Sequence, residues 1–197
     1  MNRTEIIQKY INDRGAKRYL EIGCFRNENF NKIKVDHKES VDPDPEANAT
    51  HQMTSDEYFA SHNDKFDVIF IDGLHEHRQV YRDVCNALMH LNPKGVIIMH
   101  DCMPKNEKMQ IWDNKSHQHE EWTGDTWKAY YKLYKELAYL VYVIPEDYGC
   151  GIIDTAVEVD KDFIAHDVVN MEQLTYNDYL RIRGEEGYGE LRIDDDM

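Results

Sequence analysis

The sequence predicts an α/β protein with a mostly parallel, doubly wound sheet that closes with an antiparallel hairpin. Short apolar runs typical of buried strands alternate with longer segments whose apolar residues recur at helical spacing. The connections are short, and most runs end in an acid, a histidine or a glycine. This alternation is typical of a sheet that helices cover on both faces.

Each element follows from a local pattern. The expected strands are residues 18–22, 37–41, 66–71 and 96–99, followed by a hairpin of 140–144 and 150–154. Helices are expected at the N-terminus, over 27–34, from Ser55 onward, over 76–91 and over 126–137. Pro43 and Pro45 exclude strand or helix between the second strand and the third helix, and 103–121 reads as a long surface loop.

Composition narrows the class of protein. The 197 residues fit one domain, which we assign to residues 1–160, with 161–197 as its helical, acidic C-terminal extension. The net charge of −15 argues against nucleic acid or a membrane as partner, because both require a basic surface. No apolar run reaches about 18 residues and no signal-peptide pattern occurs. The four cysteines lack metal or disulfide spacing, so we expect a cytoplasmic protein, either monomeric or homo-oligomeric.

Polar residues at the strand ends are the candidate site. Ligands of open parallel sheets bind at the carboxyl ends of the strands, because those ends meet at one edge. The residues placed there are Glu21 and Gly23, Asp42, then Asp72, Gly73 and His75, and finally His100 and Asp101. Four such endings in register predict one functional crevice.

The first strand-to-helix turn disfavours a bound pyrophosphate. Dinucleotide sites need several glycines there, and this turn contains only Gly23. Glu28 would place a carboxylate near any phosphate and repel it, although the positive charge of Arg26 would attract one. Acidic strand ends better suit a cofactor that has a ribose and a positive centre but no phosphate. Asp42, at the end of the second strand, is placed to accept hydrogen bonds from both ribose hydroxyls.

A known family carries this pattern. The segments YLEIGCFRNENF, VDPDP, TSDEYF and FDVIFIDGLHEHRQVYRDVCNALMHLNPKGVIIMHDC together resemble the class I S-adenosylmethionine-dependent methyltransferases, over residues 19–102. The closest group has D-G-x-H at the end of its fourth strand and H-D at the end of its fifth. The resemblance implies a seven-stranded, Rossmann-like sheet and S-adenosyl-L-methionine as cofactor.

The resemblance also implies a role for each strand end. The methionine part would contact Glu21, Gly23 and Cys24; the ribose, Asp42; the adenine, Ser55 and Asp56; and the sulfonium, Asp72, Gly73 and His75. Asn27 is a departure, because the family usually has its second glycine there. Asparagine tolerates a positive φ better than other non-glycine residues, so we retain Asn27 in the cofactor-binding turn.

Methyl transfer is an in-line displacement, so the protein must position, desolvate and deprotonate the acceptor. The groups available for this are His75, His100 and Asp101. We expect His100 or His75 to act as general base toward a small-molecule or glycan-like hydroxyl. In the alternative, Mg²⁺ is held by the same strand ends, as in some relatives. His100 stands where those relatives carry an acid, which disfavours Mg²⁺ because this ion prefers oxygen ligands.

Three other functions remain open from the sequence. They are a metal-dependent hydrolase that uses His75, His100 and Asp101, a nucleotide-dependent oxidoreductase on a similar sheet, and a binding module without catalysis. Single residues also have plain structural explanations. Asp42 could simply start a proline-bounded turn, and Asp72 could cap the following helix. Cys102 is more readily explained as packing than as a nucleophile.

Overall fold

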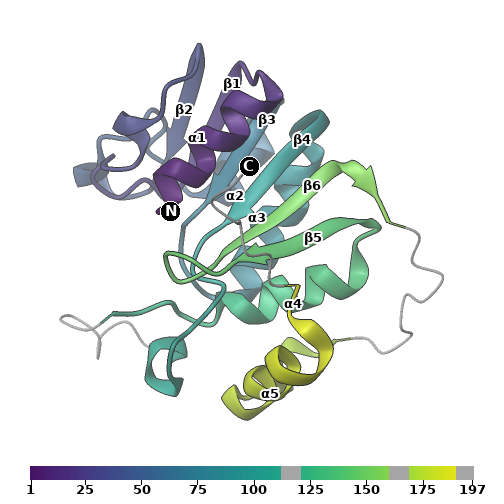
Figure 1. The fold of residues 1–197 in the computed structure, drawn as a ribbon. Coiled ribbons are helices and arrows are strands. Elements are labelled where there is room, and N and C mark those ends of the chain that lie inside the picture. Colours follow the sequence, from purple (N-terminus) through teal and green to yellow (C-terminus); the bar gives the residue numbers. More distant parts are fainter. Residues whose placement is uncertain (112–120, 160–168, 190–197) are drawn as a thin grey trace.

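The computed structural model describes residues 1–111, 121–159 and 169–189. Its sheet has the order β2-β1-β3-β4-β6-β5, in which the first four strands run parallel and β6 and β5 are antiparallel (Figure 1). The strands are β1 (Arg18–Ile22), β2 (His37–Val41), β3 (Phe66–Ile71), β4 (Leu91–Met99), β5 (Tyr139–Ile144) and β6 (Cys150–Glu158). The α/β class and the closing hairpin are therefore confirmed.

Helices cover both faces of the sheet, but unequally. Helix α1 (Arg3–Arg14) buries Ile6, Ile7 and Ile11 against one face. Helices α2 (Ser55–Ser61), α3 (His77–Met89), α4 (Thr126–Glu136) and α5 (Tyr176–Arg181) contribute to the core on the other face. None of the described helices is long and apolar enough to cross a membrane.

The alternating directions of strand side chains separate the two cores. Along β3, Ile69 and Ile71 pack with α2, α3 and α4, whereas Val68 and Phe70 pack with α1. All four side chains are buried, which explains why the strand is a continuous apolar run rather than an alternating one.

The sheet has six strands over the described residues, not the seven that the family resemblance implied. The missing strand would lie beyond β2, between β2 and α2. There the chain forms a 3-10 turn at Pro45–Ala47, and only His51 pairs with Val41, in a single parallel bridge. Pro43 and Pro45 lie in the turn that precedes this bridge, where proline cannot donate to a strand ladder.

The helix predicted over 27–34 is wrong. The segment forms turns and a short 3-10 helix, η1 (Phe30–Lys32). Phe25 and Asn27 have φ values of 48° and 59°, in the left-handed region, which an α-helix cannot include. Asn27 stabilises the turn, since its side-chain amide donates to the carbonyls of Ala47 and Asn48. The prediction that Asn27 tolerates positive φ is confirmed.

The remaining helices lie where the periodicity placed them. Thr54 caps α2 in a capping box with Glu57, and the carboxylate of Glu76 accepts from the backbone N–H of Gln79 at the start of α3. Residues 112–120 of the predicted 103–121 loop lie outside the described residues, as do 160–168 and 190–197 of the C-terminal part. The division into 1–160 and 161–197 stays a prediction.

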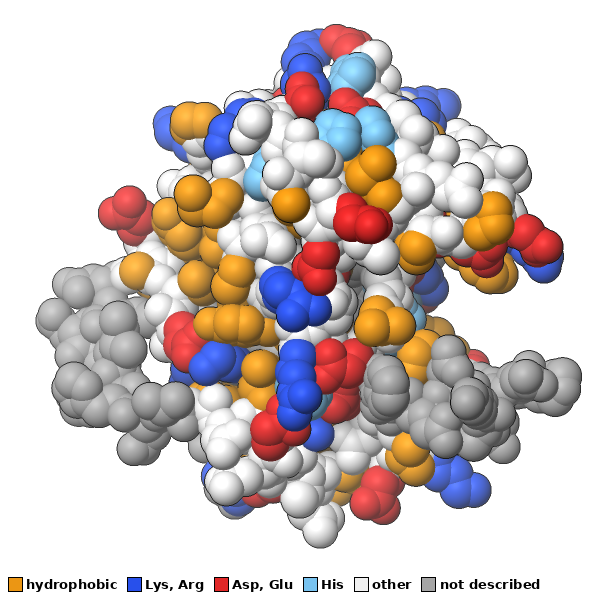
Figure 2. Space-filling view, turned by 180° about the vertical axis from the view of Figure 1, so that it is seen from behind, with side chains coloured by type: hydrophobic (Ala, Val, Ile, Leu, Met, Phe, Trp, Pro, Cys, Tyr) orange, Lys and Arg blue, Asp and Glu red, His pale blue; other side chains and the backbone are white. Residues whose placement is uncertain are grey.

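A group of polar side chains lies on β2 and its neighbours; we call it the Glu39 cluster. Glu39 accepts hydrogen bonds from His37 at 2.7 Å, from His51 at 2.8 Å and from the hydroxyl of Tyr58 at 3.0 Å. Tyr58 stacks on His62, with ring centroids 4.4 Å apart. Figure 2 shows histidine side chains gathered at one end of the molecule. Both carboxylate oxygens of Glu39 have a donor, and the bond from Tyr58 connects the edge strand β2 to α2.

Candidate active site

A cleft of about 1190 Å³ opens at the carboxyl ends of the parallel strands. Strand order reverses there, because β2 and β3 lie on opposite sides of β1, and open sheets bind ligands at such a point. The predicted residues that line the cleft are Glu21, Gly23, Cys24, Asp42, Ser55, Asp56, Asp72, Gly73, His75 and Asp101. The structure does not place Asn27 or His100 in its wall.

Glu21 lies at the floor of the cleft with only 1% of its surface exposed. Its Oε2 accepts from the Tyr19 hydroxyl at 2.6 Å and from the Asn29 amide at 3.0 Å. Burial raises the pKa of this carboxyl to about 7. A cationic group that entered the cleft beside Glu21 would therefore favour the ionised form.

The turn after β1 is held against β3 and against Asp42. Gly23 has φ of 79°, and a Cβ there would lie 2.3 Å from the backbone oxygen of Asp72. Only glycine fits this approach. The Phe25 N–H donates to Asp42 Oδ2 at 2.9 Å, and the Asp44 N–H donates to Asp42 Oδ1. Asp42 thus stabilises the turns on both sides of it and also lines the cleft. Its alternative role as the start of the proline-bounded turn is therefore present together with its place in the cleft wall.

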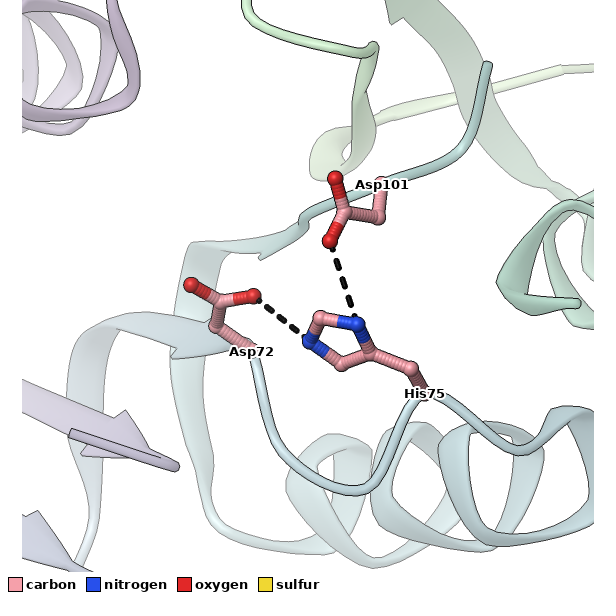
Figure 3. Close-up of side chains that lie close together, drawn as sticks. All are labelled: Asp72, His75 and Asp101. Atoms are coloured by element: carbon pink, nitrogen blue, oxygen red, sulfur yellow. Dashed lines mark hydrogen bonds and ion pairs between the residues drawn. The ribbon is translucent and has the colours of Figure 1, made fainter. Parts of the chain in front are cut away.

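Three groups from neighbouring strand ends meet in the cleft (Figure 3). His75 Nε2 lies 3.1 Å from Asp72 Oδ1, and His75 Nδ1 lies 3.2 Å from Asp101 Oδ2. Burial by itself would lower the pKa of His75, but the hydrogen bond to Asp72 and the charge of Asp101 raise it. Sequence reasoning brought these three residues together correctly.

The backbone of this group is strained. His75 and Asp101 have φ of 57° and 59°, which non-glycine residues rarely adopt. Gly124 packs so closely that a Cβ would lie 2.1 Å from the His75 carbonyl oxygen, and the Asp125 N–H donates to that oxygen. The Trp122 ring stacks on His75 at 4.9 Å between centroids. Surrounding elements therefore hold the imidazole in one position, and strain of this kind is characteristic of functional sites.

His100 lies behind the cleft wall, with 1% of its side chain exposed. Its Nδ1 is 3.1 Å from Asp101 and 3.3 Å from Asp72, and its Nε2 is 3.7 Å from Asp147. Burial alone would lower the pKa of His100, but the charges of Asp72 and Asp101 raise it well above its usual value. His100 is thus enclosed by three carboxylates and is not among the residues that line the cleft.

Sequence reasoning missed Arg3, Asp147 and Asp83. The Arg3 guanidinium donates to Asp72 at 2.7 Å and to Asp147 at 3.1 Å, and Arg3 and Asp147 both line the cleft. Hydrogen bonds from His100 and Arg3 lower the pKa of Asp147. No local signal identifies Arg3 or Asp147, because one lies in the first turn of α1 and the other in the hairpin turn. Asp83 could have been found from the sequence, because it is an acid at a position that the helical periodicity of α3 places on the buried face.

The residues present fit a divalent cation. Asp72, His75 and Asp101 each offer one ligand atom, and these atoms lie within 4.8 Å of one another. The Nδ1 atom of His75 is buried and has no hydrogen-bond partner in the described part of the chain. Two carboxylates and one imidazole form a mixed oxygen and nitrogen set, which suits Mn²⁺, Fe²⁺ or Zn²⁺ better than Mg²⁺.

Comparison with known proteins agrees with the motifs. Residues 13–102 match a family model described as a methyltransferase domain. Among solved structures, an O-methyltransferase from Klebsiella pneumoniae is 15% identical with a TM-score of 0.55, covering 79% of this chain and 80% of its own. The O-methyltransferase from Bacillus cereus, solved in complex with SAH, is 13% identical with a TM-score of 0.54, covering 77% and 80%.

A third solved structure with a similar fold is also an O-methyltransferase. The O-methyltransferase of tomaymycin synthesis from Streptomyces achromogenes, in complex with SAM, is 14% identical with a TM-score of 0.53, covering 77% of this chain and 79% of its own. No curated protein matches the sequence significantly. The fold is shared with these solved methyltransferases, and residues 13–102 are similar to a methyltransferase domain, in agreement with the motifs.

Proposed function

We propose that this protein transfers the methyl group of S-adenosyl-L-methionine to a hydroxyl of a small molecule or glycan. The single observation that carries this is the cleft at the switch point, which is lined by Glu21 and Asp42 together with the Asp72–His75–Asp101 group. A cationic sulfonium nucleoside between these acids would present its methyl group to the second group.

The cofactor assignment rests on charge and on the first turn. Glu21 offers a buried carboxylate to the methionine ammonium, and Asp42 offers its oxygens to the ribose. A pyrophosphate is disfavoured because η1 replaces the α-helix whose N-terminus would bind it. Glu28 also lines the cleft, and its charge would repel a phosphate. These features support a methyltransferase over the nucleotide-dependent oxidoreductase.

The acceptor hydroxyl must lose its proton as it is methylated. His75 and Asp101 line the cleft and lie 3.2 Å apart, so either could receive that proton. His100 touches Asp72 and Asp101 from behind, and we therefore propose that it positions these carboxylates rather than acting as the base. Of the two bases that the sequence offered, His100 and His75, this proposal retains His75.

A divalent ion would be held by Asp72, His75 and Asp101. When bound, it would lower the pKa of a hydroxyl that it coordinates, which is how metal ions generate nucleophiles at neutral pH. In either case the protein's own part is to orient the acceptor, to exclude water and to hold the carboxylates through Arg3 and His100.

The alternatives separate in one set of binding measurements. Calorimetry with S-adenosylhomocysteine, NAD and divalent ions in parallel is expected to show binding of S-adenosylhomocysteine and none of NAD. Metal binding without any nucleoside response would instead support the hydrolase. Cofactor binding without methyl transfer to a broad panel of hydroxyl compounds would support the non-catalytic module.

The free cysteines and the net charge support a cellular location and a class of acceptor. Cys24, Cys85, Cys102 and Cys150 are free, which supports a reducing compartment such as the cytoplasm. The net charge of −15 supports a small-molecule acceptor over nucleic acid.

A further inference from the structure

Asp83 is a buried acid that neither the motifs nor the proposed chemistry uses. It lies on the core-facing side of α3, between Val80 and Val84, and is 1% exposed. An acid at this position is costly unless it has a partner that compensates for burial. No salt bridge to Asp83 occurs among the described residues, and its side chain lines the cleft.

The neighbours of Asp83 form a polar corner at one end of the cleft. The Gln79 amide donates to Asp83 Oδ1 at 2.9 Å, to Ser55 Oγ at 3.2 Å and to Asp56 Oδ1 at 3.3 Å. Asp83 Oδ2 faces Gly73, where even an added Cβ would keep a distance of 3.9 Å. Burial raises the pKa of Asp83 to about 6, so at pH 7.5 the ionised carboxylate dominates and can only accept hydrogen bonds.

This corner lies next to the position of the nucleoside base. If Asp42 holds the ribose and Asp72 faces the sulfonium, the base extends toward Ser55 and α3. An amino group on the base would donate to a carboxylate there, whereas a keto oxygen would be repelled by it.

We propose that Asp83 is a cofactor-binding residue that accepts a hydrogen bond from the exocyclic amine of adenine and so selects adenosyl over inosyl cofactors. This inference rests on the proposed function. It predicts that a 6-oxo purine binds poorly because it places an acceptor against an acceptor, and sites built to hydrogen-bond an amine reject analogues that lack it.

The test compares S-adenosylhomocysteine with S-inosylhomocysteine by calorimetry at pH 7.5. The native protein is expected to bind the adenosyl compound at least tenfold more tightly. In Asp83→Asn this preference is expected to fall by tenfold or more, because the amide can donate to the keto oxygen. Asp13→Asn, an exposed acid on α1, serves as the control and should keep the preference.

The outcomes distinguish this inference from the proposed function. Equal weakening of both compounds by Asp83→Asn, or a native protein that does not discriminate between them, would overturn the role of Asp83 alone. A native protein that binds neither compound contradicts the proposed function. If Asp83→Asn does not fold, Gln79→Met, which removes the amide that orients the carboxylate, should lower the same preference. An unchanged preference in Gln79→Met would also overturn the inference.

Discussion

Two buried groups of acids and histidines differ in how completely they are satisfied. In the Glu39 cluster, both carboxylate oxygens accept hydrogen bonds, from His37 on β2, from Tyr58 on α2 and from His51 in the segment between them. In the Asp72–His75–Asp101 group, His75 Nδ1 faces Asp101 as an ion pair at 3.2 Å without hydrogen-bond geometry, and two of the three backbones are left-handed. His100 behind it contacts Asp72, Asp101 and Asp147 as ion pairs at 3.3, 3.1 and 3.7 Å.

The difference separates stability from function. A satisfied cluster lowers the free energy of the fold, whereas a strained group whose ion pairs lack hydrogen-bond geometry is held in place by its surroundings. Composition does not distinguish the two, since both combine carboxylates with histidines. The predictions below test whether activity and stability divide between the two groups as this comparison implies.

The largest expected effect is on catalysis. Asp101→Asn should lower kcat by about 100-fold or more, because proton transfer by a positioned group contributes roughly 10²–10⁴-fold. Asparagine tolerates the left-handed backbone of position 101, so any loss of stability should come only from the missing charge beside His75 and His100. Single-turnover methyl transfer and urea unfolding measure the two effects. A variant that lost stability and kept its rate would reverse the assignment.

Gly23→Ala should damage the cleft through the backbone. The left-handed φ costs an alanine about 1–2 kcal/mol, and the clash with the Asp72 carbonyl adds to this. We expect a loss of at least about 2 kcal/mol in stability and loss of S-adenosylhomocysteine binding. Gly15→Ala provides the matched control, since Gly15 has φ of 59° but nothing within 4 Å of an added Cβ. It should show the backbone cost alone and keep full binding.

Glu39→Gln should have the opposite profile from Asp101→Asn. The amide points a donor at groups that are themselves donors, and leaving such a group unsatisfied costs about 2 kcal/mol. The kcat of the folded enzyme should stay within about twofold, since no member of the Glu39 cluster lines the cleft. Reduced kcat at full occupancy of substrate would show that the two groups are coupled.

The pH dependence of stability should also identify Glu39. Burial by itself would raise the pKa of Glu39, but hydrogen bonds from His37, His51 and Tyr58 lower it. The contribution of these bonds is therefore present above the unfolded pKa and is lost as pH falls through the lower folded pKa. Urea unfolding between pH 3 and pH 6 should show a shallower decline in Glu39→Gln than in the native protein.

The smallest expected effect is a pH dependence of cofactor binding. With a pKa of about 7, Glu21 is mostly protonated at pH 6 and must ionise to bind an ammonium group. The affinity for S-adenosylhomocysteine should therefore rise by roughly tenfold from pH 6 to pH 8 and then level off. Glu21→Gln should bind more weakly and lose this rise. An unchanged pH profile in that variant would assign the titration to another group.

Local patterns were sufficient for most of the fold. Apolar runs and helical periodicity predicted β1 to β6 and helices α2 to α4, because burial on both sheet faces forces those patterns. The errors lie where a few polar residues decide the backbone. Asn27 and Phe25 turn left-handed and end any helix after β1, and a Pro-bounded segment reduces the seventh strand to the His51 bridge.

The sequence by itself determined which strand ends carry acids and histidines, because parallel strands bring their carboxyl ends to one edge. The tertiary structure decided which of those groups reach the cleft. His75 and His100 follow adjacent strands and look alike in the sequence, yet one lines the cleft and the other is enclosed by carboxylates. Arg3 and Asp147 reach the same site from α1 and the hairpin turn. Only packing over long sequence separations sets such contacts, and no local periodicity records them.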